Sequence, residues 1–419
     1  MHFGAILQRV CLMGFSILLV ASAQAMAQAG QLDPSFGQGG IVTTDFGTQL
    51  NASASVATVA IQPDSKIIVF GGVSNSNGTA VAVVRYNTDG TLDTGFGTAG
   101  IASVAGLTFP SAMTLQPDGK IVAVAFNVDG YSGVAGINVL RFSSNGSLDS
   151  TFGTGGVAST GIFDLQAPGG VVVQPNGDIL IAEGELIRLL PNGQFDSSFG
   201  TGGQAHVLGG DLANGLALLS NGKVLVTSAS FFPTSGFVSR YNSNGSLDTT
   251  FAISGQLGTT GPANALLLLT NREFLVGGNL TGSLNGPIGF ALSRYQSVGA
   301  TDAKFGTHGG VVTPLANFPT LATSGLGVQS SGDIVAFGTA SVGKTSPVFA
   351  LARYTATGKL DPTFGTNGTV TTSFGTTTLA ANSVAIQADG NIVAVGSFGT
   401  AKSQSQNDVG FKLARYLGQ

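Results

Sequence analysis

Arginine and aspartate recur as a pair along this chain, always eight residues apart. In six copies a Gly lies five residues after the Arg and a Phe lies eleven after it, as in Arg85, Gly90, Asp93 and Phe96. A guanidinium facing a carboxylate forms a strong ion pair, and the same groups could also bind a substrate. We interpret the pairs as a structural clamp, because a catalytic centre needs a position that breaks the symmetry. The Phe is expected to pack between neighbouring units.

The pairs define seven repeat units. Six units carry both partners, and the seventh is divided between the two ends of the chain, with the Asp half near the start and the Arg half at the end. A ring closed by joining the two ends explains this division. The pairs are Arg85 with Asp93, Arg141 with Asp149, Arg188 with Asp196, Arg240 with Asp248, Arg294 with Asp302, Arg353 with Asp361, and Arg415 with Asp33.

Few other residues offer catalytic chemistry. After residue 27 the sequence has no Cys, and its histidines are His206 and His308, which lack the spacing of metal ligands. No Gly-x-Ser-x-Gly motif marks a nucleophile. Carboxylates outside the repeat could meet across loops as a glycosidase pair, but their spacing favours no two of them. They are Asp45, Asp164, Glu183, Glu185, Asp211, Glu273 and Asp408. The catalytic residues, if any, are therefore unknown.

We expect no metal and no cofactor. Residues 87–90 and 127–130 resemble ion loops, which makes calcium the weaker alternative, but both lack the closing carboxylates of an EF-hand loop. A turn preference explains the first loop better than a ligand set does. The positions equivalent to Asp89 hold Asn145, Asn192, Asn244, Val298 and Thr357.

The segments that must position these residues have the pattern of short strands. Each unit contains four apolar or alternating runs, as in 40–44, 59–62, 66–70 and 81–86, and no helical period follows residue 27. Tight turns such as Asp118-Gly119 and Asn221-Gly222 join two of the runs, because these residues tolerate positive φ. In the fifth unit Arg272 replaces the Gly, so the geometry of that turn is left open.

The repeat length predicts the architecture. Successive Asp residues of the pairs lie between 47 residues (Asp149 to Asp196) and 60 residues (Asp33 to Asp93) apart, a spacing typical of solenoids or propellers. We predict an all-β, seven-bladed β-propeller of four-stranded antiparallel blades, closed by the N-terminal strand 40–44 joining the last blade, about 374–416. A β-solenoid is the alternative, and units longer than a solenoid coil argue against it.

The variable connections between the regular turns are expected to share one face, where binding usually resides. They are 73–80, 127–136, 229–236, 279–289, 339–347 and 397–410. The third unit has almost no loop, only 183–185, so we expect a gap there with two carboxylates at its rim. The candidate binding residues of this face are aromatic side chains that could stack on a sugar or a partner, or that plug the channel mouth: Phe109, Tyr131, Phe231, Phe232 and Phe318.

Composition and the first residues indicate an exported protein. Charged residues make up 9% of the chain and the net charge is −4, which excludes a basic surface for nucleic acid. Residues 1–27 have the pattern of a signal peptide, with Arg9, an apolar run at 10–20 and small-residue cleavage sites. This run is too short to span a membrane. Residues 28–419 would then form a single propeller domain, monomeric and without membrane insertion.

Two stretches resemble a known repeat. The turn 116–121 followed by 141–156, and the segment 351–368, are similar to the bacterial delta-60 repeat. The resemblance covers nearly the whole chain after residue 27 and is weakest in the fifth unit, where Phe251-Ala252 replaces Phe-Gly. It implies a propeller-like fold and no assigned activity.

These observations favour a binding or scaffold module that acts in the periplasm, at the cell surface or outside the cell. Its partner would be a cell-surface or extracellular protein or glycan, recognised by the face with the variable connections. The alternative is a hydrolase or lyase with its site at the mouth of the central channel. Such an enzyme should bring together polar residues that break the symmetry, for example His206 or Asp211 facing Asp164.

Overall fold

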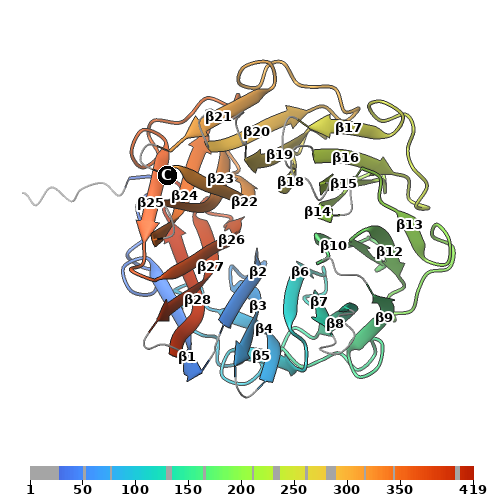
Figure 1. Cartoon of the computed structure of the whole chain (residues 1–419), viewed down its shortest axis with the longest axis horizontal. Coiled ribbons are helices and arrows are strands. Elements are labelled where there is room, and N and C mark those ends of the chain that lie inside the picture. Colours follow the sequence, from blue (N-terminus) through green and yellow to red (C-terminus); the bar gives the residue numbers. More distant parts are fainter. Residues whose placement is uncertain are drawn as a thin grey trace, which may run out of the picture.

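The protein is a β-propeller. The computed structural model describes residues 28–50, 53–75, 78–128, 135–163, 167–209, 212–229, 236–259, 263–279, 289–315, 318–342, 345–401 and 406–419. These residues form seven four-stranded antiparallel sheets and no helix, so nothing among them resembles a membrane-spanning helix. Figure 1 shows the sheets arranged around a central axis. The predicted seven-bladed propeller of four-stranded blades is confirmed. The signal-peptide prediction falls on residues 1–27, outside the described residues.

The strands follow the chain from the inside of each blade to the outside. Blade 1 contains β2 (Ser53–Ile61), β3 (Ile67–Asn75), β4 (Gly78–Tyr86) and β5 (Ile101–Ala105). Blade 2 contains β6 (Phe109–Leu115), β7 (Ile121–Val128), β8 (Ala135–Phe142) and β9 (Val157–Phe163). Blade 3 contains β10 (Gly170–Val173), β11 (Ile179–Ala182), β12 (Glu185–Leu189) and β13 (Gln204–His206). Blade 4 contains β14 (Leu212–Leu218), β15 (Val224–Ala229), β16 (Gly236–Tyr241) and β17 (Gln256–Thr259).

The remaining blades repeat the same order. Blade 5 contains β18 (Ala265–Leu268), β19 (Phe274–Asn279), β20 (Gly289–Tyr295) and β21 (Gly310–Pro314). Blade 6 contains β22 (Thr320–Val328), β23 (Ile334–Val342), β24 (Thr345–Tyr354) and β25 (Thr369–Ser373). Blade 7 contains β26 (Thr378–Ile386), β27 (Ile392–Ala401), β28 (Gln406–Tyr416) and β1 (Ile41–Leu50). Because β1 pairs with β28, the outer strand of this blade comes from the opposite end of the chain.

The core lies between the blades. Seven clusters of buried apolar residues each draw on two neighbouring sheets, as where Phe70 of blade 1 packs with Leu140 of blade 2. A middle strand such as β3 has a blade on both faces, so four successive residues, Ile67 to Phe70, are all buried. The Phe that follows eleven residues after the repeated Arg belongs to these clusters. Phe96, for example, lies between blades 1 and 2. Burying a Phe contributes roughly 1.5–3 kcal/mol.

The strand order separates two faces. The tight turn after each innermost strand and the longer turn after the third strand lie on one face, which we call the regular face. The other connections lie on the opposite face, which we call the variable face.

Three predicted loops, 73–80, 339–347 and 397–410, are mostly strand. Their Ser, Thr and Gly residues continue the hairpins, as in the pairing of Thr400 with Asp408. In blade 5 Arg272 adopts a φ of 68° and keeps the tight turn in place of Gly.

Candidate functional site

The repeated Arg and Asp residues form an ion pair in all seven units. In each, the Arg Nε donates to the Asp Oδ2 over 2.6–2.8 Å, and the guanidinium lies over the ring of the repeated Phe, 4.5–4.8 Å from its centre. The same guanidinium donates to a backbone carbonyl in the next blade. For Arg85 this acceptor is Ser144, and for Arg141 it is Pro191. The clamp therefore links neighbouring blades, and within one blade it links the two sides of the turn that separates the Arg from the Asp.

The clamp carboxylates have their hydrogen-bonding capacity filled. Thr151 donates to Asp149 through its hydroxyl and its backbone amide, at 2.6 and 3.1 Å. These bonds, together with the charge of Arg141, hold the pKa of Asp149 well below its usual range, although burial opposes them. A carboxylate so engaged has little capacity left for a substrate. The arrangement fits a structural role.

Of the two carboxylates predicted at the rim of a gap in blade 3, one is buried. Glu183 is not at a rim, because its side chain is buried at 1% exposure in the hairpin between β11 and β12. Glu185 is partly exposed and lies 3.2 Å from His206 Nδ1, so an exposed Glu–His pair joins β12 to β13. Asp164 and Asp211, which were expected to face such a group, lie outside the described residues.

The aromatic candidates divide into two groups. Phe109, at the start of β6, is 41% exposed and stacks on Phe126 with ring centres 4.7 Å apart. Phe318 is half-buried against the cluster between blades 5 and 6. Tyr131, Phe231 and Phe232 fall outside the part of the chain that the structure describes. Phe109 is thus the exposed ring among the candidates in the described part of the chain, and it begins the innermost strand of blade 2.

The innermost strands enclose a central cavity of about 640 Å³. One position of its wall recurs in every blade, four residues before the last residue of the innermost strand. In five blades this position is a β-bulge, as between Val56 and Thr58. The seven residues at this level are Ala57, Ser111, Gly169, Asn214, Asn264, Ser324 and Asn382.

This ring of residues breaks the sevenfold symmetry. Four polar members, Asn214, Asn264, Ser324 and Asn382, come from the consecutive blades 4 to 7, and we call them the amide arc. Opposite them, blades 1 to 3 contribute Ala57, Ser111 and Gly169, and the Ser111 hydroxyl donates to the carbonyl of Pro168. All residues that line the cavity in the described part of the chain are uncharged. Sequence analysis missed the arc because its side chains differ between units, so only the alignment of the strands reveals it.

The described residues contain no cluster of three or more His, Cys, Asp or Glu able to hold a metal ion. At the suggested calcium loop, Asp89 accepts hydrogen bonds from the amide and hydroxyl of Thr91, at 2.9 and 2.7 Å. That carboxylate closes its own turn. The other suggested loop, 127–130, extends beyond the described residues.

Comparison with known proteins agrees with the fold. Residues 62–96, 116–152, 219–251 and 329–364 match the family described as "Domain of unknown function (DUF5122) beta-propeller". The chain carries repeats of a propeller family of unknown function. Each match runs from the tight turn to the repeated Phe and so includes one clamp. No curated protein matches this propeller-repeat chain.

The propeller is also distantly similar to solved structures. A protein of unknown function from Bacteroides caccae is 17% identical over 61% of this chain and 84% of its own, with a TM-score of 0.37. An ulvan lyase bound to an oligosaccharide is 10% identical over 87% and 95%, with a TM-score of 0.42. An α-L-arabinofuranosidase from Fusarium graminearum is 10% identical over 93% and 97%, with a TM-score of 0.39. Likeness at this level carries no argument on function.

Proposed function

We propose that this propeller is an exported binding module that recognises a glycan of the cell surface or its surroundings through the variable face and the channel mouth. The amide arc is the observation that supports this function best. An Asn amide has two donor hydrogens and an acceptor oxygen, which suit the neighbouring hydroxyls of a sugar. The oxygen of Asn382 already accepts from the backbone amide of Ser397 over 3.3 Å, so this residue offers its donors. A pocket that fixes a ligand with a few converging polar groups is typical of small-molecule sites, and 640 Å³ is within their usual volume.

Phe109 supports the same proposal. It stands at the start of the strand that carries Ser111, which lines the cavity, and its apolar ring is exposed. A ring of this kind covers the C–H face of a sugar while amides bind its hydroxyls. Because Phe126 stacks behind it, the ring is held in place before a ligand arrives.

A hydrolase or lyase would need an acid and a base close to the scissile bond. The described walls of the channel supply uncharged groups instead, so binding is the function that this geometry supports better. The enzymatic alternative would depend on residues outside the described part, such as Asp164 and Asp211. Testing bound glycans for cleavage products distinguishes the two.

The test is a glycan array and an envelope pull-down with residues 28–419. The matched variants are Asn214→Ala with Asn264→Ala in the arc, and Gln38→Ala with Thr98→Ala, two exposed positions on the regular face. We expect selective glycan binding that weakens at least tenfold in the arc variant, with the Tm unchanged, and stays intact in the control. Capture of a protein without glycan, or equal binding by both variants, would contradict the proposal. Cleavage products would support the enzymatic alternative.

A further inference from the structure

The boundary between blades 4 and 5 carries an apolar surface on the regular face. Ile253 is 85% exposed, more than any other large apolar residue in the described part of the chain, and Val298 is 53% exposed. The backbone amide of Ala252 donates to the carbonyl of Val298 over 2.9 Å, so the turn that holds Ile253 lies directly against the turn that holds Val298. Ala252 and Ala300 are exposed as well. We call these four residues the blade 4–5 patch.

The other six blade boundaries provide a comparison, because the same backbone bond joins the same two turns at each of them. The position of Ile253, two residues after the repeated Phe, is polar in all six other blades: Gln38, Thr98, Thr154, Thr201, Thr307 and Thr366. The position of Val298, four residues after the clamp Arg, is polar in five other blades: Asp89, Asn145, Asn192, Asn244 and Thr357. The apolar pair therefore belongs to this one boundary and not to the repeat.

The patch residues are unfavourable for the fold itself. Ala252 has a φ of 45°, where the six equivalent residues are Gly with φ between 52° and 56°. A residue with a Cβ is strained in this region. Val298 also lacks the side-chain oxygen with which its counterparts close their turn, as in the 3.0 Å bond from the Ser147 amide to Asn145. Departures from a repeat that gain nothing inside the fold are expected where a surface has a function.

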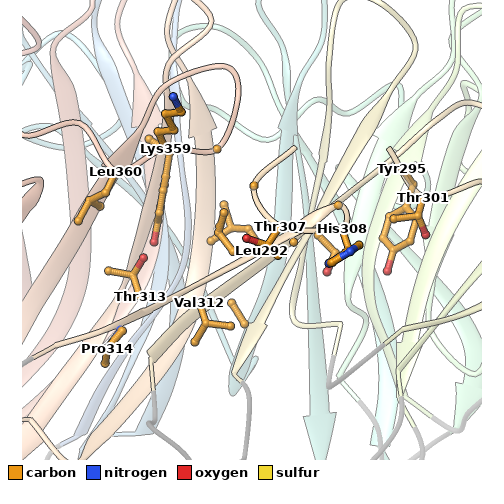
Figure 2. Close-up of a pocket in the computed structure, with 18 residues that line it drawn as sticks. Leu292, Tyr295, Thr301, Thr307, His308, Val312, Thr313, Pro314, Lys359 and Leu360 are labelled. Carbon is orange, nitrogen blue, oxygen red and sulfur yellow. The ribbon is translucent and has the colours of Figure 1, made fainter. Parts of the chain in front are cut away.

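The shape of the patch favours a macromolecule over a small ligand. At the neighbouring boundary of blades 5 and 6, Thr307 holds the position of Ile253 and lines a cavity of about 910 Å³ together with His308 and Lys359 (Figure 2). Ile253 and Val298 line neither that cavity nor the central one. Exposed aliphatic side chains outside a cavity suit the surface of a protein partner, whereas small ligands occupy concave sites.

The exposed charged side chains in the regular-face turns of blades 4 and 5, all within the described residues, are cations. Arg272 is exposed in the tight turn of blade 5 with a φ of 68°, where five other blades have Gly. Lys304 is exposed two residues after Asp302, where five other blades have a Ser or Thr that donates to the clamp Asp. The clamp carboxylates are buried in ion pairs, and Glu273 lies 3.4 Å from Arg294. Carboxylates on a partner would complement this surface.

Other blades give the regular face the opposite charge. Exposed carboxylates lie in the turns of blades 7, 1 and 2: Asp389, Asp64, Asp89 and Asp118. Figure 1 shows blade 1 across the ring from blades 4 and 5. An anionic membrane lying flat on this face would meet these carboxylates together with the cations, and like charges repel. A partner that covers only blades 4 and 5 avoids them.

We propose that the blade 4–5 patch docks a protein partner, through a segment that presents an aliphatic side chain flanked by Asp or Glu. The aliphatic side chain would lie on Ile253 and Val298, and the carboxylates would lie towards Arg272 and Lys304. The patch is on the regular face, whereas the proposed glycan site uses the variable face and the channel. Either proposal can therefore fail while the other holds.

The experiment selects a random twelve-residue peptide library, displayed on phage, on residues 28–419 and in parallel on the double variant Ile253→Thr with Val298→Asn. This variant restores residue types of the other blades, so its Tm should be equal or higher. We expect the peptides enriched on the unmodified protein alone to combine an aliphatic residue with Asp or Glu. In fluorescence anisotropy the best peptide should bind at least tenfold more weakly to the double variant, and at least threefold more weakly to Arg272→Gly with Lys304→Thr.

The matched control is Thr307→Ala with Thr357→Ala, which changes the equivalent positions at the boundary of blades 5 and 6 and should leave peptide binding unchanged. Enriched peptides without acidic residues, or equal affinity for the Ile253→Thr and Val298→Asn variant, would overturn the proposal. A lower Tm in that variant would assign the two residues to the fold instead. Loss of phosphatidylglycerol vesicle binding in the variant, or loss of a dimer in sedimentation velocity, would show that a membrane or a second copy occupies the patch and would also overturn the proposal.

Discussion

The backbone amide of Gly365 in blade 6 donates a hydrogen bond of 2.8 Å to the carbonyl oxygen of Ala29. In blade 1 the equivalent amide, that of Gly97, donates to Asn145 in the reversing turn of blade 2, also over 2.8 Å. Ala29 therefore occupies the position of Asn145 in the turn of blade 7. Residue 30 is Gly with a φ of 85°, close to the 89° of Gly146.

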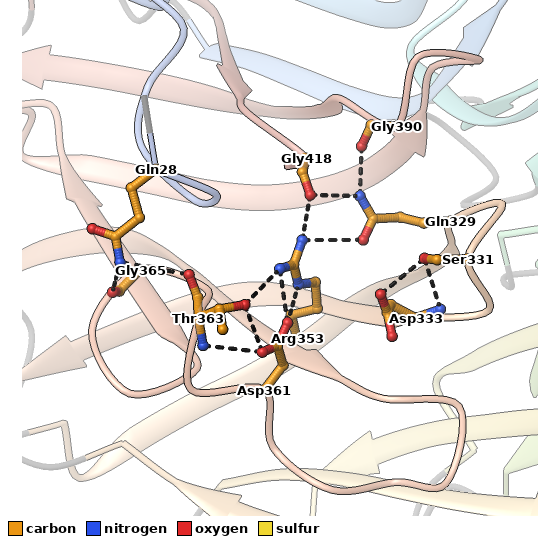
Figure 3. Close-up of polar contacts among 10 residues, drawn as sticks. All are labelled: Gln28, Gln329, Ser331, Asp333, Arg353, Asp361, Thr363, Gly365, Gly390 and Gly418. Atoms are coloured by element: carbon orange, nitrogen blue, oxygen red, sulfur yellow. Dashed lines mark hydrogen bonds and ion pairs between the residues drawn. The ribbon is translucent and has the colours of Figure 1, made fainter. Parts of the chain in front are cut away.

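The other half of that turn comes from the opposite end of the sequence. Arg353 donates to the carbonyl of Gly418, as the clamp Arg residues of other blades donate to the turn of the next blade. Figure 3 shows Arg353 between Asp361 and Gly418, with Gln28 reaching Gly365 close by. The turn is completed by bonds of 2.8 Å from Gly30 to Leu417 and 2.9 Å from Leu417 to Gln31. Two chain segments thus build one turn.

Joining these segments should stabilise the protein. We predict that residues 29–418, cyclised by a direct peptide bond between Gly418 and Ala29, fold with the native turn and gain roughly 4 kcal/mol in free energy of unfolding. The gain comes from the lower conformational entropy of the unfolded ring. Urea unfolding of the cyclic chain and of its linear counterpart measures the difference. A less stable ring would show that the direct bond strains the turn.

Removing one clamp charge should cost much more than removing an exposed charge beside it. We predict that Asp149→Asn destabilises the protein by about 3 kcal/mol, because it leaves the buried Arg141 unmatched. Asp118→Asn removes the same charge in the same blade, from an exposed pair with Lys120 at 3.2 Å. It should change the stability by less than about 0.5 kcal/mol. Chemical unfolding compares the two variants; equal effects would contradict a clamp role for Asp149.

The fold could be predicted from sequence because the same physical demands recur seven times. Each tight turn needs a residue that tolerates positive φ, and each blade needs an Arg, an Asp and a Phe at one spacing. The ends of strands were harder to predict. Residues such as Thr400 and Asp408 continue a hairpin through backbone bonds, which leave no apolar pattern in the sequence.

The candidate sites could not be predicted in the same way, since they are departures from the repeat. The amide arc occupies positions where other blades have Ala57 or Gly169, so no repeated residue type marks it. The link from each clamp Arg to the next blade was likewise invisible, because its acceptor is a backbone carbonyl.

Two glycines of blade 2 should respond differently to an added methyl group. Gly146 has a φ of 89°, and a Cβ there would lie 2.8 Å from the amide nitrogen of Gly97 in the neighbouring blade. Gly155 also has a positive φ, 61°, but a Cβ there would meet nothing within 4 Å. We predict a loss of about 3 kcal/mol for Gly146→Ala and about 1 kcal/mol for Gly155→Ala. The urea unfolding midpoints of the two variants measure these losses of stability. Similar losses in both variants would mean that the strain of a positive φ, and not the contact with Gly97, sets the cost.

Acid should unfold the protein through its clamps. In the folded state the pKa of every clamp carboxyl, from Asp33 to Asp361, is lowered from 3.8. A carboxyl whose pKa is lower in the folded state stabilises the fold above pH 3.8, and this stabilisation is lost as the pH falls toward the folded value. We therefore predict a constant urea midpoint from pH 7 to about pH 5 and a steep fall below about pH 4.

The Asp149→Asn variant tests whether the clamps cause this acid sensitivity. It lacks one of the seven shifted carboxyls, so its stability should fall less steeply between pH 5 and pH 3 than that of the unmodified protein. Asp118→Asn is a weaker comparison, because the pKa of Asp118 is also lowered in the folded state. Burial raises the pKa of this carboxyl, but the hydrogen bonds from Lys120 lower it by more. An equal slope in Asp149→Asn and the unmodified protein would place the acid sensitivity outside the clamp, whereas a smaller slope ties it to the bond between Asp149 and Arg141.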